Sequence, residues 1–596
     1  MISAAVVAAA VGLVPGVAQA AGPSADRTPG ATATPDPAKA GAAKTATGKT
    51  GSGTGNTGAG TGKTGAEGSK AAVTKAELEK STFFSPAERA VRTTPSGAPA
   101  PHEGPAPAQR AGGAEAASGD PYLGITMGAD NTSARGIRLT AYVMSITDMR
   151  SVVDVTVDWG DGSTQNEYLL SDSDYPFLHL DHAYTGLGAH KVTVTATNRY
   201  FKLTTTNTVD VVVSGSEFTP HAPTRLLDTR NGTGAPSARA VAPYGTTRVK
   251  VAGAGGIPAG ASAVALNLTA TNTTAAGHVT AYAAGTEQPT TSNVNFAAGQ
   301  SVPNMAIVPV SEDGYVELAN RSAGATDLIA DVTGYFTRSE ANGYTSLAPT
   351  RLVDTREGLG TDRGKVAGQR TFDTQIAGRG GVPAGGVTAV ALNVTVTNPE
   401  EAGHLTLFPS GQQTPTTSNL NFTAGQTVAN SVIVPVGPDG RINVRNGSWN
   451  PADVIVDVVG YYSADGKAAY RPLTPKRLTD TREWNWPVDG QDYRKQEVSA
   501  DKSAIEGAVL NVTVTNTQGS GHLTVAPDPN SWDQYTSGKA VRPTPPNSSH
   551  LNWTKGTTVS NLVQTSTGLN SLLDFWNRGW EPTDLVVDMF GVYDRR

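Results

Sequence analysis

The sequence predicts an all-β chain built from consecutive β-sandwiches, and three observations lead to this prediction. Short runs of alternating apolar and polar residues, separated by turn signals, fill the chain after about residue 120. A segment of about 120 residues occurs three times in a row, which indicates a repeated structural unit. The residues before position 120 are instead rich in Ala, Gly, Thr, Pro and Lys, which indicates a linker.

The repeats share landmarks in the same order. Pro223-Thr-Arg-Leu-Leu-Asp-Thr-Arg230 returns as Pro349-Thr-Arg-Leu-Val-Asp-Thr-Arg356 and as Pro475-Lys-Arg-Leu-Thr-Asp-Thr-Arg482. We assign the copies to residues 218–338, 345–464 and 470–596. In Leu392-Asn-Val-Thr-Val-Thr397 the apolar residues are expected to face a core, with Asn393 and the threonines on the opposite face. Each copy is predicted to be a jelly-roll-like β-sandwich.

The start of the chain predicts export. Residues 1–20 contain a short apolar run followed by Ala18-Gln19-Ala20, which is typical of a signal peptide and its cleavage site. Residues 21–119 are predicted to form a disordered linker, because burial of so few large apolar side chains does not offset the entropy of ordering. Two capping-box patterns, Thr74-Lys-Ala-Glu77 and Ser85-Pro-Ala-Glu88, predict short helices within 74–92.

Residues 120–215 carry a second kind of module. Trp159-Gly-Asp-Gly-Ser163 ends an alternating strand with a tight turn, and Trp159 is expected to cap the core. Together with His182-x-Tyr184, Gly188 and Val192-Thr-Val-Thr-Ala-Thr-Asn198, this segment resembles the PKD domain, an immunoglobulin-like β-sandwich of extracellular proteins. The resemblance implies a spacer or a weak binder of proteins and polysaccharides. The three repeats resemble those of secreted proteins of high-GC Gram-positive bacteria, which brings no assigned activity.

Composition excludes several functions. The net charge of −6 and the lack of clustered Lys and Arg argue against a nucleic-acid partner. The chain has no cysteine, so disulfides, thiolate zinc sites and thiol nucleophiles are ruled out. No run after the predicted signal peptide is long and apolar enough for a membrane span. We find no catalytic motif and no arrangement of residues for a cofactor or a metal.

Charged residues shared by the copies predict structural ion pairs. An aspartate stands inside an otherwise apolar strand near the end of each copy, where a buried carboxylate needs a partner. We expect it to bond the arginine of the Asp-Thr-Arg element and so join the first and last strands. The predicted pairs are Asp331 with Arg230, Asp457 with Arg356, and Asp588 with Arg482. The Gly-His elements at His278, His404 and His522 supply one histidine per copy, too few for a metal, and are expected to be structural.

The tryptophans distinguish the copies from one another. Trp449 and Trp580 replace Ala323 in a loop that bears Gly and Pro, where burial is difficult, so they are candidate ligand-binding residues. A ring folded back on its own domain is the alternative. The third copy adds further candidates at Trp484, Trp486 and Trp532. Its altered spacings are expected to fall in loops.

The function predicted from these features is that of a secreted, non-enzymatic binding or adhesion protein, outside the cell or at its surface. Its repeated modules would bind cell-wall glycan, another polysaccharide or a surface protein, since repetition favours avidity over catalysis. A first alternative is a structural particle or stalk head in which the copies pack about a pseudo-threefold axis. A second alternative is a secreted hydrolase of glycan or peptidoglycan with its site in the third copy.

Overall fold

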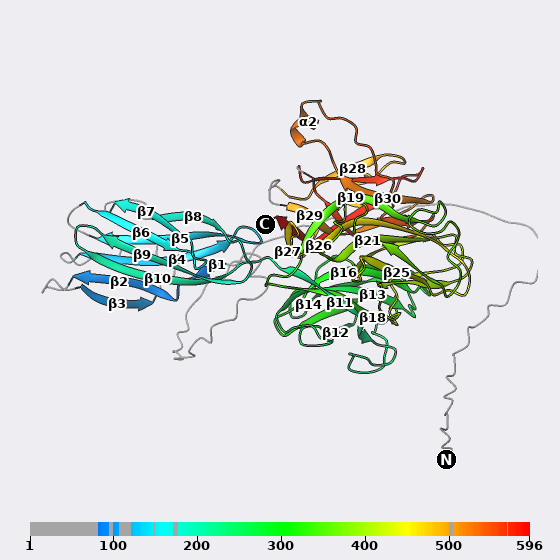
Figure 1. Ribbon diagram of the computed structural model, residues 1–596, viewed down its shortest axis with the longest axis horizontal. Coiled ribbons are helices and arrows are strands. Elements are labelled where there is room, and N and C mark those ends of the chain that lie inside the picture. Colours follow the sequence, from blue (N-terminus) through cyan, green and yellow to red (C-terminus); the bar gives the residue numbers. More distant parts are fainter. Residues whose placement is uncertain are drawn as a thin grey trace, which may run out of the picture. The chain divides into compact units, whose positions relative to one another are not determined.

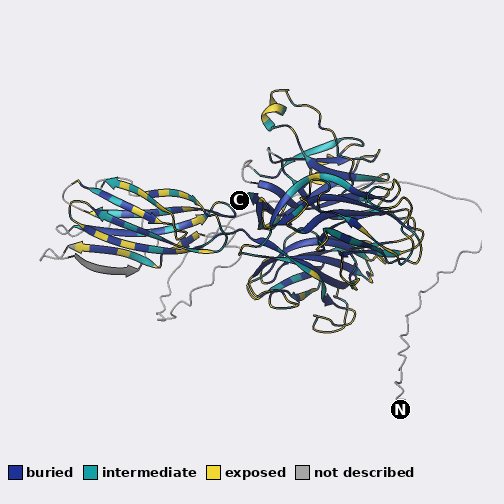
Figure 2. Ribbon diagram, viewed as in Figure 1, coloured by how far each residue is buried: buried dark blue, intermediate teal, exposed yellow. Residues whose placement is uncertain are grey.

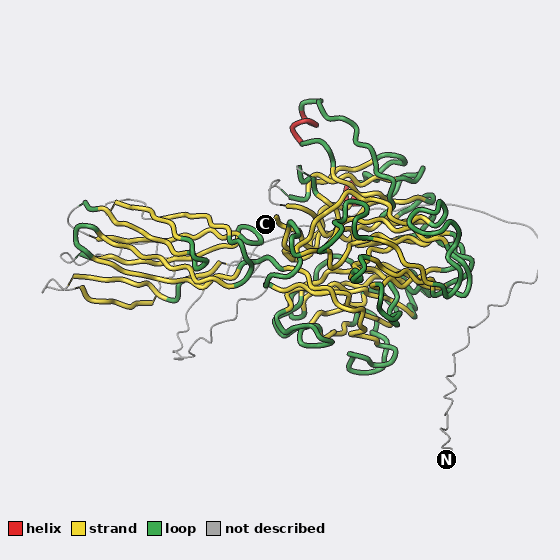
Figure 3. Tube along the Cα trace, in the orientation of Figure 1, coloured by secondary structure: helices red, strands yellow, loops and turns green. Residues whose placement is uncertain are grey.

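The computed structural model describes residues 82–93, 99–105, 121–146, 150–170, 177–499, 505–568 and 570–595. The predicted signal peptide and most of the predicted linker lie outside these residues. Within them the chain is almost entirely β-structure, with one sandwich followed by three jelly rolls (Figures 1 and 3). The all-β fold class predicted from the sequence is thereby confirmed. No helix in this part of the chain is long and apolar enough to cross a membrane.

The first sandwich consists of two antiparallel sheets around an apolar core. One sheet has the order β3-β2-β4-β5-β8 with β1 also paired to β4, and the other has the order β10-β9-β6-β7. Trp159 follows β6 and is buried in the core, as the sequence predicts. The strands are β1 Thr82–Phe84, β2 Ala87–Thr93, β3 Pro99–Pro105, β4 Tyr122–Asn131, β5 Gly136–Ile146, β6 Val152–Asp158, β7 Thr164–Leu170, β8 Phe177–Ala183, β9 Ala189–Asn198 and β10 Leu203–Val212.

The helix predicted after Ser85 is wrong, because this segment forms strands β1 and β2. The Ser85 hydroxyl accepts a hydrogen bond from the Met127 backbone N–H on β4 rather than capping a helix. Phe83 and Val91 are buried in the core of the sandwich. Pairing with β4 and burial of these side chains therefore outweigh the local capping signal. The predicted linker is also shorter than 21–119, since 82–93 and 99–105 belong to this sheet.

Each repeat is a jelly roll of eight strands in two four-stranded sheets. The inner sheet has the first, eighth, third and sixth strands in that order, and the outer sheet the second, seventh, fourth and fifth. The inner sheets of the second and third copies join at β19 and β27. The first copy contains β11 Glu217–Asp228, β12 Thr246–Lys250, β13 Ala261–Thr271, β14 Gly277–Ala283, β15 Val294–Phe296, β16 Val302–Pro309, β17 Tyr315–Asn320 and β18 Asp327–Thr337.

The other two copies repeat this order of strands. The second copy contains β19 Gly343–Asp354, β20 Thr371–Gln375, β21 Val387–Thr397, β22 Gly403–Pro409, β23 Leu420–Phe422, β24 Val428–Pro435, β25 Arg441–Asn446 and β26 Asp453–Ser463. The third contains β27 Ala468–Asp480, β28 Tyr493–Glu497, β29 Ile505–Thr515, β30 Gly521–Pro527, β31 Leu551–Trp553, β32 Val559–Ser566, β33 Leu572–Asn577 and β34 Asp584–Arg595. It also has a 3-10 turn at Thr481–Trp484 and a short helix, α2, at Trp532–Thr536.

The inner sheets are buried on both faces (Figure 2). Leu392, Val394 and Val396 lie in the core between the two sheets of their copy, as predicted. Asn393 and Thr395 point the other way and are also buried. That second face packs against the neighbouring copies, and a separate apolar core takes residues from all three.

Asparagine side chains close a ring of hydrogen bonds among the three inner sheets. The Oδ1 atom of one asparagine in each copy accepts from a backbone N–H of another copy: Asn304 from Leu562 at 3.1 Å, Asn430 from Met305 at 3.3 Å, and Asn561 from Ser431 at 3.0 Å. Their Nδ2 groups donate to Asn511, Asn267 and Asn393 of neighbouring copies at 3.1 to 3.2 Å. The three copies are thus one pseudo-threefold assembly rather than independent domains.

Aromatic side chains from the first and last strands fill the shared core beside the asparagine hydrogen bonds. Phe218, Tyr344 and Tyr470 come from the first strands, and Phe336, Tyr462 and Tyr593 from the last. The hydroxyls of Tyr462 and Tyr593 lie 2.6 Å apart and both bond Gln564. Each first-strand ring lies on a glycine of its own last strand, at Gly334, Gly460 and Gly591. A side chain at these glycines would overlap the ring.

We predict that Gly460→Ala destabilises the whole three-copy assembly, because the added methyl group would overlap the Tyr344 hydroxyl. Overpacking of this kind costs about 1 to 3 kcal/mol. Urea denaturation followed by intrinsic fluorescence measures the loss. Gly385→Ala is the matched control, since a Cβ there meets nothing within 4 Å. Equal stability of the two variants would contradict the packing described.

Candidate functional site

The three predicted strand carboxylates are paired, but with a different arginine from the one expected. The pairs are Asp331 with Arg225 at 2.9 Å, Asp457 with Arg351 at 2.9 Å, and Asp588 with Arg477 at 2.8 Å. The predicted partners Arg230, Arg356 and Arg482 instead bond Asp228, Asp354 and Asp480. The predicted pairing was therefore wrong. The reason is strand register, since Arg225 stands opposite Asp331 in the ladder, whereas Arg230 lies beyond the end of β11.

These charges form one network in each copy. Arg225 bonds both Asp331 and Asp228, and Asp228 also accepts from Arg230. Burial raises the pKa of Asp331 although Arg225 opposes it, whereas hydrogen bonding to Arg230 lowers the pKa of Asp228. The network joins the first and last strands of the inner sheet. It is repeated in every copy and has a structural role.

The Gly-His histidines are half-buried at the start of the fourth strand of each copy. Burial lowers the pKa of His278 and His404, and lowers that of His522 to about 4. They are therefore neutral near pH 7. Among the residues that the structure describes, no group of three His, Asp or Glu side chains is placed to hold a metal ion.

Trp449 and Trp580 project into solvent from equivalent loops. Their side chains are 79% and 82% exposed, so the rings do not fold back over their own copies. The backbone of each loop packs against a glycine, Gly368 or Gly490, which leaves no room for a side chain there. The first copy lacks this tryptophan but has Tyr244 beside the same loop, 62% exposed and bonded through its N–H to Ser322. Each copy thus presents one exposed aromatic ring at the same end.

Trp484 and Trp486 are exposed as well, at 58% and 69%, near the edge strand β28. The Arg494 guanidinium lies over both rings, 5.5 Å from the Trp484 centroid and 5.9 Å from that of Trp486. These cation–π contacts hold the two indoles beside the third copy. The two indoles and the guanidinium that lies over them form a second exposed group on the third copy.

Trp532 is not a free surface ring. It begins α2, is half-buried, and donates from Nε1 to the Glu497 carboxylate at 3.1 Å. Helix α2 belongs to the long β30–β31 loop of the third copy, which accounts for the larger spacing seen in the sequence. Of the five candidate tryptophans, the structure therefore leaves four available for a ligand.

A buried carboxyl pair under this loop was missed by the sequence analysis. Asp574 on β33 is fully buried, and burial, followed by the neighbouring Asp528, raises its pKa to about 8. Asp528 is also buried and accepts hydrogen bonds from the Tyr535 hydroxyl at 2.5 Å and from Asn530. An aspartate in a polar β30–β31 loop carries no local signal of this contact, because folding alone brings it to β33.

The chemistry available to this pair is limited by its burial. A carboxylic acid held neutral near pH 7, as burial holds Asp574, has the properties of a general acid. Tyr535, however, covers Asp528, and Asp528 and Asp574 are only 2% and 0% exposed. The arrangement therefore favours a structural role beneath the β30–β31 loop.

We predict that Asp457→Ala lowers the free energy of unfolding by about 3 to 5 kcal/mol, because it removes the buried carboxylate opposite Arg351 and leaves Asp354 as the remaining charged partner of that guanidinium. A double-mutant cycle tests the pairing. Combination with Arg351→Ala should show strong coupling, and combination with Arg356→Ala should be nearly additive. Stronger coupling of Asp457 to Arg356 than to Arg351 would contradict the observed pairing and support the one expected from the sequence.

We predict that Asp574→Asn removes part of the pH dependence of stability. The folded-state pKa of Asp574 is raised from 3.8 to about 8, so the wild-type protein loses stability as pH rises through this range. The asparagine of the variant stays neutral. The free energy of unfolding of the variant should therefore rise relative to that of the wild type from pH 4 to pH 8, and the difference should then level off. At about 1.4 kcal/mol per pKa unit, the difference reaches several kcal/mol. Urea denaturation across this pH range measures it, and parallel curves would contradict the raised pKa.

Comparisons with known proteins leave the chain without a family. No family model matches it, and no curated protein matches its sequence. Two solved structures are weakly similar at 8% identity and a TM-score of 0.14. One is described as the atomic structure of Sulfolobus Turreted Icosahedral Virus. The match covers 64% of this chain and 92% of the viral chain. The other, on the triple jelly roll fold and turret assembly in an archaeal virus, covers 64% and 90%. Similarity at this level carries no conclusion, and the jelly-roll assignment here depends on strand order alone.

Proposed function

We propose that this chain is a secreted, non-enzymatic binding protein that acts outside the cell or at its surface. The three jelly rolls form one head, and the exposed rings Tyr244, Trp449 and Trp580 contact cell-wall glycan, another polysaccharide or a surface protein. The observation that carries the proposal is the repeated exposure of one aromatic ring at the same loop end of every copy.

The physical basis is the cost of leaving indole rings in water. A large aromatic surface on a rigid loop stacks well on the apolar face of a sugar ring or fills a pocket of a protein partner. Because the shared core fixes the three copies relative to one another, their rings meet a repeating ligand simultaneously. Several weak contacts then give a strong combined interaction.

The pseudo-threefold core also supports the alternative that the head is purely structural. A binding head has the same architecture and differs only in that its exposed rings contact a ligand. The predicted signal peptide supports secretion, and the resemblance of residues 120–215 to the PKD domain agrees with an extracellular setting.

We predict that the full chain is retained on purified cell wall or polysaccharide, and that Trp449→Ala with Trp580→Ala weakens this retention by about tenfold or more. Adding Tyr244→Ala should weaken it further. Tyr200→Ala, which removes an exposed ring of the first sandwich, is the matched control. Co-sedimentation across a panel of walls and glycans gives the measurement.

Two outcomes of this experiment would overturn the proposal. Absence of retention across the panel would favour the purely structural head. Release of soluble glycan fragments by the full chain, with loss of release on truncation of the third copy, would favour the hydrolase.

A further inference from the structure

The turn that follows the Asp-Thr-Arg element is different in the third copy. In the first two copies the second and fourth residues after this element are glycines with positive φ: Gly232 and Gly234, and Gly358 and Gly360. A Cβ on Gly234 or Gly360 would lie only 1.9 or 2.1 Å from a backbone carbonyl oxygen of the first strand. The third copy has Trp484 and Trp486 at these two positions. It therefore cannot form the turn of the other copies.

The two tryptophans lie on a segment that is anchored at both ends. Its 3-10 turn begins at Thr481, which is buried, and the Trp486 backbone N–H donates to the Thr481 carbonyl oxygen at 3.0 Å. Farther on, the Val488 backbone N–H donates to the Thr583 carbonyl oxygen at 2.9 Å, and the Val488 side chain is buried in the core. The backbone that carries the indoles is thus fixed to the third copy in advance, which lowers the entropic cost of binding a ligand.

Arg494 is a third residue that distinguishes this place from the other copies. It stands on β28 where the first copy has Thr247 on β12 and the second has Phe372 on β20. Its guanidinium lies over both indoles. Stacking on a ring face leaves the N–H groups at the guanidinium edge available to an acceptor. We call Trp484, Trp486 and Arg494 the Trp-Arg group.

The Arg494 guanidinium has no acidic partner in the described part of the chain. No hydrogen bond or ion pair joins it to these residues, and its Nε atom is buried without an acceptor. Burial lowers the pKa of Arg494, and no described acidic side chain opposes this shift, whereas Glu483 of the same turn raises the pKa of Arg482 instead. Arginine stays protonated at neutral pH, so the group carries a half-buried positive charge that an anionic ligand would neutralise.

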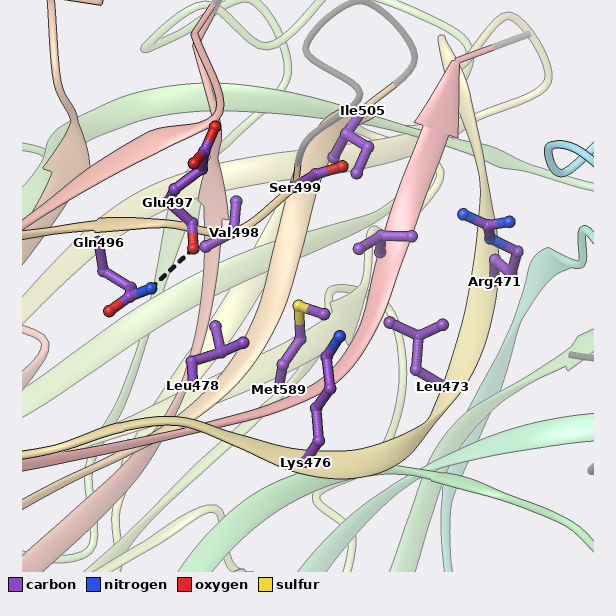
Figure 4. Close-up of a pocket in the computed structure, with 11 residues that line it drawn as sticks. Arg471, Leu473, Lys476, Leu478, Gln496, Glu497, Val498, Ser499, Ile505 and Met589 are labelled. Carbon is purple, nitrogen blue, oxygen red and sulfur yellow. Dashed lines mark hydrogen bonds between the residues drawn. The ribbon is translucent and has the colours of Figure 1, made fainter. Parts of the chain in front are cut away.

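Residues 500–504, which the structure does not describe, belong to the opposite end of the sheet. Asp480, directly before the turn, pairs with Val586, whereas Ile505 pairs with Asp594, eight residues farther along β34. Eight residues of a strand span about 26 Å. Figure 4 shows the Ile505 end and the pocket there, whose lining residues include no member of the Trp-Arg group.

The Trp-Arg group suits a sugar ring that carries a carboxylate. The apolar face of a sugar ring stacks on an exposed indole, and the fork of N–H groups on a guanidinium matches the two oxygens of a carboxylate. A neutral sugar would leave the charge of Arg494 without a partner. An inorganic anion would leave the indoles uncovered. A saccharide with carboxylates uses all three side chains, so charge and shape together favour this ligand.

We propose that the Trp-Arg group is a binding site for an acidic saccharide, a chain of sugars that bear carboxylates. The indoles stack on the sugar rings, and the Arg494 guanidinium bonds a carboxylate. The site uses none of the rings assigned to wall binding, which are Tyr244, Trp449 and Trp580. It therefore goes beyond the proposed function and does not depend on it.

Binding of trigalacturonate to the full-length protein, measured by isothermal titration calorimetry, tests this proposal. We expect the methyl ester of trigalacturonate, which keeps the rings and lacks the charge, to bind at least about tenfold more weakly. Arg494→Thr restores the residue of the first copy and should weaken trigalacturonate about tenfold while leaving the ester unchanged. Trp484→Gly with Trp486→Gly restores the glycines of the other copies and should weaken both ligands.

Arg239→Thr, which removes an exposed arginine of the first copy, is the matched control and should bind normally. Thermal melting identifies any variant that fails to fold, and Arg494→Phe, which restores the residue of the second copy, then replaces Arg494→Thr. Absence of trigalacturonate binding, equal affinity for the ester, or equal affinity of wild type and the Arg494 variant would overturn the proposal. Wall retention is measured separately with the Trp449 and Trp580 variants, so failure of one proposal leaves the other standing.

Discussion

The rest of the assembly depends on how the inner sheets satisfy their polar residues away from water. A buried amide without a partner is costly, and the third and sixth strands of each copy place asparagines on the face that meets the other copies. Asn304, Asn430 and Asn561 resolve this by bonding across copy boundaries in a closed ring. One copy alone would expose these asparagine side chains, and the apolar residues on the same face of the sheet, to water. Three copies therefore form the smallest unit in which each of these asparagines has its partner from another copy.

This constraint explains which residues the copies share. The strand asparagines, the Asp–Arg network and the glycines beneath the aromatic rings all maintain the inner sheets and their contacts. The asparagines and the aspartates among them are buried and already bonded. The asparagines also donate to backbone carbonyls in the loops that lead into β15, β23 and β31 of the outer sheets. The loops after β17, β25 and β33, all within the described residues, take no part in these hydrogen bonds, so residues there differ between copies at little structural cost. Exposed rings such as Trp449 and Trp580 lie in this variable region.

Local pattern predicted the strands well and the contacts between distant segments poorly. Leu392-Asn-Val-Thr-Val-Thr397 indicated a strand with one apolar face, and that face lies in the core. Burial of Asn393 was not predictable, because alternation alone looks the same whether the polar face meets water or another copy. Asp331 was expected to be paired, yet its partner Arg225 depends on strand register. The strands formed by 82–93 and the Asp528–Asp574 contact depend on tertiary structure in the same way.

The third copy shows how far the outer layer can change once the inner sheet is fixed. Its β27–β34 ladder keeps the bulge found in the other copies, and Asn511 and Asn561 keep their places in the ring. Outside that sheet it has a shorter β28–β29 loop without the Gly380-Gly381 pair of the second copy, gains the loop with α2, and has Gln496 where the other copies have Val249 and Thr374. Here the neighbouring copies hold the inner sheet in place through the shared core, so the third copy changes its outer layer while its inner sheet keeps the contacts of the other two.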